Sequence, residues 1–421
     1  MAVRFSVARG REHINARQSD GGGGRRGEYS DPARPILLAA AAPVSEDIAY
    51  CGWNGGGRPQ SPRRNTVIRT RPPRVLVVYN EPVLPPDHPD AASEHDIVAT
   101  SEAVERVLTA GGFDTNRIGY SRHPRELLRK LRTWKPDIAF NLFEGEADRT
   151  ETEIANAALL EWMQIPFTGS PSSAIALGRD KVRTKYMLQG AGLPTAPFCV
   201  VEALPAPQWP HAWPAIVKPA CQDSSVGIDQ AAVVTSQKQL ESRAAYLFER
   251  YGGAVLVEQF VAGREFHVNV FEEPGDGPAA NRLRVVPLAE IRFEYKDDEA
   301  LWPIYSYAAK WNEDSHEYRA TPLDTGLTLP SPLMEQVTQV CCAAYSLVGL
   351  RDYGRVDIRL TPDGRPFILE VNPNPYLNSI ALIDGVAAMG RPHADFLRDI
   401  ARNALTRVHA DRPARRIPVA G

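Results

Sequence analysis

Short apolar runs that alternate with helix-like stretches place the strongest constraint on the fold. Residues 74–79 (RVLVVY) form a nearly continuous apolar run, which is typical of a strand that is buried on both faces. A helix-like stretch follows at 93–110, a second strand at 137–142 and a second helix at 151–163. Strands that alternate with helices in this way predict an α/β domain with a mostly parallel sheet.

The chain beyond residue 169 has a different pattern. A helix is expected over 180–190, where Gly-Leu-Pro at 192–194 ends it. The segments that read as strands after Pro214 are 215–218, 231–235, 255–259 and 265–271. A boundary near Gly169 is therefore expected between the α/β part and a second part that is rich in strands.

Composition changes sharply near residue 74. The segment before it has many Arg and no Lys, with GGGG at 21–24 and GGG at 55–57. Such a segment has little apolar surface to bury, so disorder is expected there. Two other interpretations remain open, a targeting segment around the apolar run at 36–43 and a start codon downstream of Met1.

Length, charge and cysteine content bound the class of protein. A chain of 421 residues exceeds one ordinary hydrophobic core, so two or three domains are expected. The formal net charge of -3 gives no reason to expect a nucleic-acid partner. The sequence contains no apolar run of about 18 residues, so neither a membrane span nor a membrane partner is expected. The five cysteines have neither disulfide-framework nor metal-ligand spacing, which favours a cytoplasmic location.

Polar side chains gather in a predicted β-hairpin near the end of the chain, GRVDIRLTPDGRPFILEVN. The Pro-Asp-Gly turn joins two strands in which residues two apart share a face. Arg355 and Asp357 therefore project together from the first strand, and Glu370 and Asn372 project together from the second. The alternative is a salt-bridged surface patch in which Arg355 pairs with Asp357 or Glu370.

A second group of residues is suited to a nucleotide. Lys218 ends an apolar strand and is followed by the loop ACQDSSVG, whose backbone N–H groups can cradle phosphate while the lysine neutralises charge. Lys181 is a weaker candidate of the same kind. Glu258 ends the strand at 255–259, a common way to hold a ribose or an adenine amino group, and Glu265 follows it. Taken alone, Lys218 is equally compatible with a solvated surface hairpin, and a glutamate at the end of a strand is usually solvated.

The order of these features resembles the ATP-grasp superfamily, and the D-alanine–D-alanine ligase branch in particular, over residues 74–405. The segments IPFTGS at 165–170 and GLP at 192–194, and Asp180-Lys181 with Lys185, strengthen the resemblance. It implies an α/β (α+β ATP-grasp) fold in which an N-terminal parallel-sheet domain precedes two α+β subdomains that sandwich ATP. The expected divisions are a disordered extension at 1–73, an N-terminal α/β substrate domain at 74–170, a central ATP-grasp subdomain at 171–254, a C-terminal ATP-grasp subdomain with the metal site at 255–405 and a tail at 406–421.

The resemblance also implies site residues. The residues expected to bind ATP are Lys181, Lys218, Ser225, Gly227, Glu258, Val261, Glu265 and Lys310. Within this set Lys181 and Lys218 would contact phosphates, Glu258 the adenine and Glu265 the ribose. The expected catalytic residues are Arg355, Ser224, Glu94 and Lys310, with Glu94 on the amino group of the first substrate.

Asp357, Glu370 and Asn372 match the metal ligands of the family, and two Mg²⁺ (or Mn²⁺) ions are expected. Oxygen ligands shared with substrate phosphates are what Mg²⁺ prefers, and Glu370 is the natural bridging carboxylate. Arg355 would face the transferred phosphate or the developing oxyanion. The histidines His95, His123, His267 and His316 show no metal spacing and are interpreted as ordinary polar residues.

The family pattern is broken near the substrates. Trp311 stands where the family has Tyr, Tyr376 stands where it has Gly, and FEGE at 143–146 replaces its His-Gly motif. We therefore expect an ATP-dependent carboxylate–amine ligase that works through an acylphosphate, with amino-acid or short-peptide substrates and a possible homodimer. Two rivals remain open: a ligase of the same fold with another amino-acid, peptide or thiol acceptor, and a non-catalytic ATP-binding sensor or scaffold.

Overall fold

The structure, a computed structural model, describes residues 71–85, 91–147, 149–222, 224–274, 282–296 and 298–410. Apart from 71–73, the expected extension lies outside the described residues, as does the expected tail from residue 411 onward. Within the described part, no helix combines the length and apolar character that a membrane span requires. The division into domains at 170 and 254 stays a prediction.

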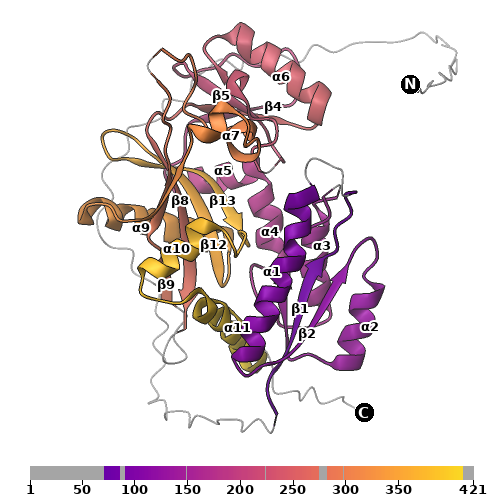
Figure 1. Cartoon of the computed structure of the whole chain (residues 1–421). Helices are drawn as coiled ribbons and strands as arrows, with labels where there is room; N and C mark the ends of the chain where they lie inside the picture. Colours follow the sequence, from indigo (N-terminus) through magenta and orange to yellow (C-terminus); the bar gives the residue numbers. More distant parts are fainter. Residues whose placement is uncertain are drawn as a thin grey trace, which may run out of the picture. The chain divides into compact units, whose positions relative to one another are not determined.

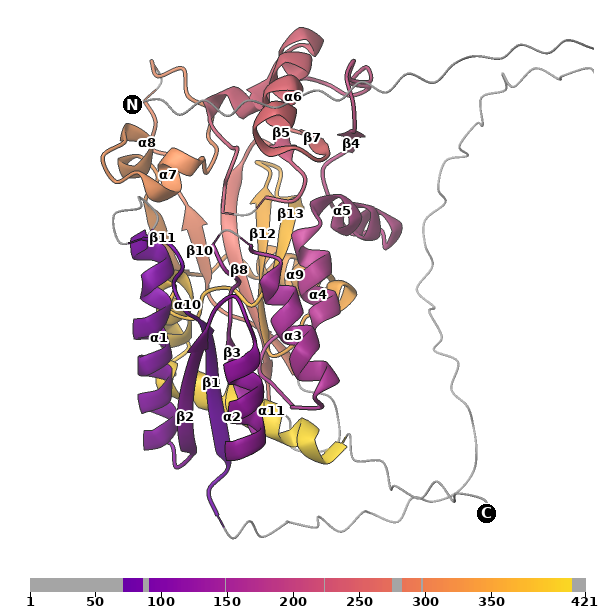
Figure 2. The same ribbon diagram turned by 90° about the vertical axis from the view of Figure 1, so that its right-hand side faces the viewer.

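A parallel three-stranded sheet begins the fold, with β1 (Arg74–Asn80) between β2 (Asp114–Tyr120) and β3 (Ile138–Leu142). Figure 1 labels β1 and β2, and Figure 2 labels all three strands. Alternate residues of β1 enter two different cores. Val75 and Val77 pack with α1 (Ala91–Ala110) and α11 (His393–Ala410). Leu76 and Val78 pack on the other side, with α2 (Arg125–Trp134) and α3 (Thr152–Trp162). The predicted parallel sheet is confirmed.

Two helices, α4 (Ser172–Arg179) and α5 (Lys181–Gly190), lead to a second sheet. The Asp180 side chain caps α5 by accepting a hydrogen bond from the Arg183 backbone N, at 2.9 Å. The second sheet is antiparallel, in the order β4 (Phe198–Val201), β7 (Val255–Gln259), β5 (Ala215–Pro219) and β6 (Val233–Val234), and α6 (Gln237–Tyr251) covers one face.

One predicted strand is shorter than expected. The segment predicted as a strand at 231–235 begins with a 3₁₀ turn, η1 (Gln230–Ala232), and only Val233–Val234 pairs as β6. The cause is local, because the Asp229 side chain accepts a hydrogen bond from the Ala231 N and holds the turn.

The third sheet carries the predicted hairpin. Its order is β11 (Leu323–Leu327), β10 (Leu288–Ile291), β8 (Arg264–Glu273), β12 (Tyr353–Leu360) and β13 (Pro366–Pro373), and β9 (Arg282–Val285) also pairs with β8. All these pairings are antiparallel. The helix α9 (Ser331–Val348) packs on one face, and α7 (Tyr307–Trp311), α8 (His316–Arg319) and α10 (Ile380–Ala388) complete the element order. Figure 2 shows the strands of this sheet from the side.

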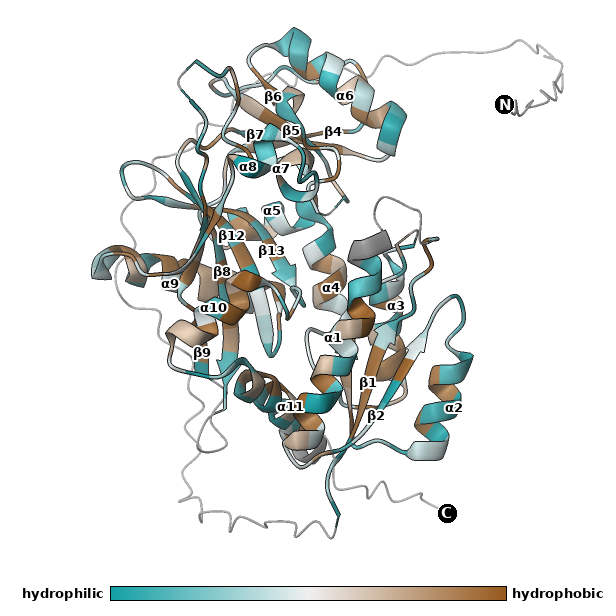
Figure 3. Ribbon diagram, viewed as in Figure 1, coloured by the Kyte–Doolittle hydropathy of each residue, from teal (hydrophilic) through white to brown (hydrophobic). Residues whose placement is uncertain are grey.

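Alternation along each strand decides which side chains remain for function. Val356 and Ile358 of β12 enter the core with α9, so Arg355 and Asp357 project from the opposite face. In the second sheet Val255 and Val257 of β7 pack on α6, and Glu258 projects away from them. Figure 3 shows the hydropathy of each element: β1 is brown along most of its length, whereas α2 and α6 carry both teal and brown residues.

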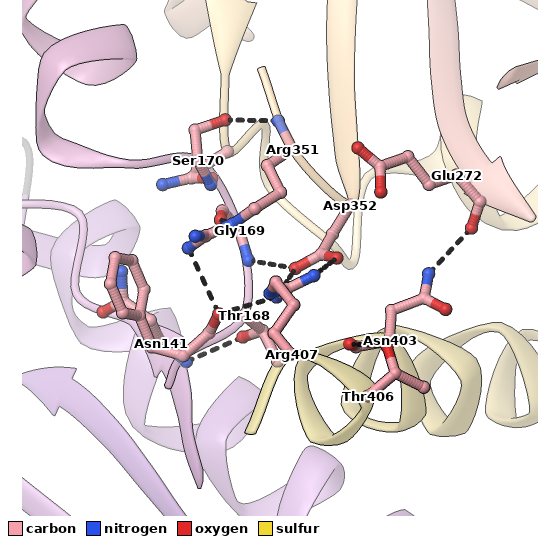
Figure 4. Close-up of polar contacts among 12 residues, drawn as sticks. Asn141, Thr168, Gly169, Ser170, Glu272, Arg351, Asp352, Asn403, Thr406 and Arg407 are labelled. Atoms are coloured by element: carbon pink, nitrogen blue, oxygen red, sulfur yellow. Dashed lines mark hydrogen bonds and ion pairs between the residues drawn. The ribbon is translucent and has the colours of Figure 1, made fainter. Parts of the chain in front are cut away.

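A buried ion pair connects the segment between α3 and α4, which contains Gly169, to the C-terminal helix α11 (Figure 4). Asp352, fully buried, accepts hydrogen bonds from Arg407 Nη1 at 2.7 Å and Nη2 at 2.8 Å, and from the Gly169 backbone N at 2.8 Å. Arg351 donates to the Gly169 carbonyl at 2.7 Å and lies over the ring of Phe167. Gly169 has a φ of 86°, and a Cβ there would lie 2.4 Å from a side-chain atom of Asn374, so the close approach requires glycine.

Candidate functional site

The hairpin places its four polar side chains as predicted. Asp357 lies opposite Glu370, and Arg355 lies opposite Asn372, in the antiparallel register of β12 and β13. A β-bulge next to Asp357 leaves Leu369 as the extra residue of β13. The bulge lets Ile368 enter the core with α9 while Glu370 stays on the polar face, although the two are only two residues apart.

Asp357 is held by its neighbours on this face. Arg355 donates to both carboxylate oxygens, at 2.7 Å and 2.9 Å, and Asn372 Nδ2 donates to Oδ2 at 3.0 Å. The ion pair anticipated by the surface-patch alternative therefore forms, but on a half-buried face, since the side chains of Arg355 and Asp357 are only 20% and 8% exposed. A pair that is this protected from water interacts more strongly than a surface pair.

His267 joins the hairpin from β8, which pairs with the other edge of β12. It lies directly opposite Asp357, so Glu370, Asp357 and His267 form one row across three neighbouring strands. The His267 Nε2 atom is 4.0 Å from Asp357 Oδ1. Burial lowers the pKa of His267 to about 4, which keeps the ring neutral at physiological pH. Sequence reasoning missed this residue, because strand pairing between distant segments is what brings it here.

Glu370 lies among positive charges. Lys181 Nζ, at the start of α5, is 3.3 Å from Glu370 Oε2 and also donates to the Gln222 carbonyl at 2.7 Å. Burial alone would raise the pKa of the Glu370 carboxyl, but the charges of Lys181, Arg355 and Lys218 outweigh it and hold that pKa well below its ordinary value. The carboxylate is therefore ionised throughout the physiological range.

Glu258 forms a buried ion pair with two lysines. Lys218 Nζ is 2.7 Å from Glu258 Oε2, and Lys185 contacts Oε1. Lys185 also donates to Thr195 Oγ1 at 2.6 Å and to the Ile368 carbonyl at 3.1 Å, which connects α5 to both antiparallel sheets. Burial opposes ionisation of Glu258, but the two lysine charges outweigh it and lower the pKa to about 2. The sequence motifs indicate Lys185 only as part of the family resemblance and do not predict its pairing with Glu258.

Replacing Glu258 by Gln is expected to lower the free energy of unfolding by about 2–3 kcal/mol at neutral pH, since Lys185 loses its counter-ion but can release its proton. Glu258 has a folded-state pKa below the ordinary 4.5. Its stabilising effect is therefore complete above about pH 4.5 and is lost as the pH falls through about 2. Urea unfolding of both proteins between pH 2 and 7 measures the difference.

The matched control is Glu249→Gln, at an exposed position of α6. We expect this variant to unfold like the wild type at every pH. A Glu258→Gln effect that stays constant down to pH 2 would contradict the depressed pKa.

The loop after β5 is joined to the segment that contains α7. Ser224, Ser225 and Gly227 have left-handed φ values of 56°, 63° and 74°. Ser225 Oγ donates to the Tyr305 carbonyl at 2.9 Å, and Trp311 Nε1 donates to the Ser224 carbonyl at 3.0 Å. The structure thus brings the predicted Ser224, Ser225 and Gly227 close to α7, where the Lys310 ammonium lies over the Trp311 ring.

Three predicted residues have contacts that the motifs did not indicate. Glu265 Oε2 accepts two hydrogen bonds from Arg359, at 2.9 Å and 2.7 Å, and Arg359 also donates to the Val261 carbonyl at 3.1 Å. Glu94 Oε2 accepts from the backbone N atoms of the segment before α1, at 3.0 Å and 2.8 Å. The Oε1 atom of Glu94 is buried without a hydrogen-bond partner among the described residues. Arg359 joins Glu265 and Val261, whereas the contacts of Glu94 are at α1.

Comparisons with known proteins identify the family of the chain. The family model described as "D-ala D-ala ligase C-terminus" matches residues 187–400. D-alanine–D-alanine ligase from Methylococcus capsulatus is 31% identical over 298 residues, covering 70% of this chain and 86% of that protein. The enzyme of the same name from Geobacter sulfurreducens is 30% identical over 293 residues, covering 69% and 83%.

Solved structures share the fold. The crystal structure of D-alanine–D-alanine ligase from Bacillus anthracis complexed with ATP has a TM-score of 0.60 at 20% identity, and covers 80% of this chain and 99% of that chain. The ligase of the same name from Coxiella burnetii has a TM-score of 0.56 at 18% identity, and covers 81% and 96%. The architecture of three sheets described above is therefore shared with these structures.

Proposed function

Because the chain belongs to the D-alanine–D-alanine ligase family within the ATP-grasp superfamily, we propose that it binds ATP at the polar face of β8, β12 and β13 and uses it to join a carboxylate to an amine. The resemblance drawn from the sequence motifs is confirmed by this membership. The observation that carries the proposal is the cluster on that face, in which Glu370 and Asp357 lie beside Lys181 and Arg355.

Positive charge on this face supports phosphate binding. Lys181 and Lys218 approach the face from α5 and β5, and Arg355 adds a guanidinium with a fixed fork of donors. These cations are now paired with carboxylates, and a triphosphate would compete for the same donors. The loop at 224–227 supports the proposal as well, since the left-handed φ values of Ser224, Ser225 and Gly227 indicate a tight turn, a conformation in which backbone N–H groups can bind an anion.

The donor set at the hairpin fits a hard divalent cation. Asp357 and Glu370 supply carboxylate oxygens and Asn372 an amide oxygen, the ligand types that Mg²⁺ and Mn²⁺ take. Among the described residues, no three acidic, histidine or cysteine side chains stand close enough to hold a cation by themselves. That arrangement suits a cation that takes its remaining ligands from phosphate oxygens. When bound, the cation offsets the charge of the triphosphate and orients it.

The proposed reaction has two steps. A substrate carboxylate oxygen attacks the γ-phosphorus of ATP, so that an acylphosphate forms and ADP leaves. An amine nitrogen then attacks the acyl carbon, so that the amide bond forms, the nitrogen loses a proton and inorganic phosphate leaves. Arg355 stabilises charge on the transferred phosphate and on the tetrahedral intermediate.

The remaining predicted residues take supporting roles in the proposal. Glu258 and the Val261 backbone face the adenine, and Glu265, which Arg359 orients, faces the ribose. Lys310 on α7 adds a further charge to the phosphates. Ser224 and Glu94 belong to the side where the first substrate binds, and the buried Oε1 atom of Glu94 is available to accept from an ammonium group.

A second candidate is a ligase of the same family with another acceptor, and one observation favours it. Tyr376 extends its hydroxyl to Thr100 Oγ1 of α1, at 2.7 Å, and Asn378 Nδ2 donates to the same oxygen at 2.8 Å. Thr100 and Tyr376 border a cavity of about 10 Å³, which Asn141 and Glu144 also line. A large side chain fixed at this place changes the space beside the hairpin, so the second substrate need not be D-alanine.

We expect ADP release by the purified protein to require Mg²⁺, ATP and two amino-acid substrates, because the acylphosphate needs an amine to complete turnover. A coupled assay across single and paired D- and L-amino acids measures it. Turnover with D-alanine alone would assign dipeptide synthesis, and turnover with another pair would assign the second candidate.

Binding of ATP without ADP release under any pair would contradict catalysis and favour a sensor or scaffold. Calorimetric titration with ATP separates that outcome from a protein that does not bind the nucleotide at all. Glu370→Ala provides the blank for contaminating ATPase.

A further inference from the structure

His267 on β8 lies where a ligand of the proposed cation would lie. We infer that its imidazole is an additional ligand of the cation bound at Asp357, and that this chain therefore favours first-row transition cations such as Mn²⁺ over Mg²⁺ more than oxygen ligands alone would. The inference rests on the proposed function only in placing a nucleotide-bound cation at the hairpin. The three residues that the sequence motifs assign to the metal do not include it.

Strand register brings the two side chains together. Asp357 of β12 lies directly opposite His267 of β8, and residues opposite each other in an antiparallel pair project from the same face. The neighbours of His267 on β8, Phe266 and Val268, enter the core with α9, which leaves the imidazole on the polar face. His267 therefore belongs to the same face as the predicted metal ligands.

The distance between the two side chains fits one shared cation. Nε2 of His267 is 4.0 Å from Oδ1 of Asp357. Metal bonds to imidazole nitrogen and carboxylate oxygen are each roughly 2 Å long, so two ligands of one ion stand at most about 4.2 Å apart. The separation lies just inside that limit and is too long for a direct hydrogen bond between the two groups. A cation that has these two ligands on nearly opposite sides would thus join them without movement of either strand, and it would share Oδ1 with the Arg355 Nε donor at 2.7 Å.

The chemistry of the ligand predicts the preference. Carboxylate, carbonyl and water oxygens suit both Mg²⁺ and Mn²⁺, whereas an imidazole nitrogen adds affinity for first-row transition cations and little for Mg²⁺. On a cation held at Asp357, the His267 nitrogen would take the place of one water oxygen, which raises affinity for Mn²⁺ relative to Mg²⁺. The nearby Tyr305 ring, 6.1 Å from the imidazole between centroids, packs at one side of His267 and restricts its rotation.

The test is pulsed electron paramagnetic resonance of Mn²⁺ bound to the full-length protein with a non-hydrolysable ATP analogue. A coordinated imidazole gives a ¹⁴N coupling, which changes to a ¹⁵N coupling in protein grown with ¹⁵N-histidine. We expect this signal in the wild type and its loss in His267→Gln. Titration of Mn²⁺ should show a Kd at least about tenfold higher in the variant, with a much smaller change for Mg²⁺.

The matched control is His316→Gln. His316 is also paired with a carboxylate, since its Nε2 is 2.9 Å from Glu299 Oε2, but it lies on α8 with half of its side chain exposed. This variant should keep the nitrogen coupling and the wild-type Mn²⁺ affinity. Thermal unfolding of both variants checks that neither substitution changes the fold.

The outcomes separate this inference from the proposed function. Bound Mn²⁺ without histidine coupling, or a coupling that survives in His267→Gln, overturns the inference and leaves the ligase proposal intact. Wild-type protein that binds no Mn²⁺ with the nucleotide analogue overturns it as well. A protein whose Mn²⁺ shows the coupling but which releases no ADP would instead overturn the ligase proposal. The labelled wild type decides the question even if the variant fails to fold.

Discussion

Glu370→Gln is expected to lower ADP release at least about a hundredfold, because it removes a charge that acts where the phosphoryl group is transferred. Gln keeps the size of the side chain and removes only the charge. Glu370 faces Lys181 at 3.3 Å and lies opposite Asp357 in the hairpin, so both its charge and its position belong to the proposed phosphate and metal site. The measurement is steady-state ADP formation with a saturating substrate pair.

Asp363→Asn is the matched control for this prediction. Asp363 lies in the turn of the same hairpin and forms an exposed ion pair with Arg365, in which the side chains are 60% and 66% exposed. We expect wild-type turnover from this variant. Substrate-dependent turnover of Glu370→Gln at the wild-type rate would mean that the hairpin takes no part in the reaction, and it would contradict the proposed function.

Asp352→Asn is expected to lower the free energy of unfolding by about 3–5 kcal/mol, since it removes the counter-ion of Arg407, whose side chain is only 22% exposed. Unlike a buried lysine, an arginine cannot release its proton to avoid the penalty. Asn is chosen because residue 352 has a φ of 64°, a conformation that Asn tolerates better than Ala. Equilibrium unfolding in urea, followed by circular dichroism, measures the change.

The control for stability is Glu126→Gln, which breaks a pair with Arg129 on the surface of α2, where the side chains are 55% and 63% exposed. Exposed pairs of this kind contribute about 1 kcal/mol or less. If Asp352→Asn also lowers the free energy of unfolding by less than about 1 kcal/mol, the buried pair shown in Figure 4 does not hold the segment between α3 and α4 to α11.

The sequence was sufficient for elements with strong local patterns. The apolar run at 74–79 became β1, the strand predicted at 255–259 matches β7, and the turn signal correctly joined β12 to β13. Two residues of one face in each hairpin strand were therefore predictable from period-two alternation alone. By contrast, neither β2 nor α2 was predicted. For β2 the reason is that its sequence, DTNRIGY, is mostly polar and its side chains are mostly half-buried.

Parts of the site depend on register and packing, which no short segment encodes. The bulge at Leu369 separates Ile368 from Glu370, and the pairing of β8 with β12 brings His267 to Asp357. Arg359 similarly reaches Glu265 only because these two strands pair. Local alternation states which residues share a face of one strand, but a neighbouring strand is chosen by contacts between distant segments.

By itself the sequence determined the parallel N-terminal sheet, the polar hairpin and the family to which the chain belongs, because each depends on local periodicity or on motifs in a fixed order. Only the tertiary structure decided which charges meet. Glu258 obtains Lys185 and Lys218 as partners, and Asp352 obtains Arg407, through the packing of elements far apart in the chain. The physical reason is that electrostatic interaction depends on distance and burial in space, which only the folded chain defines.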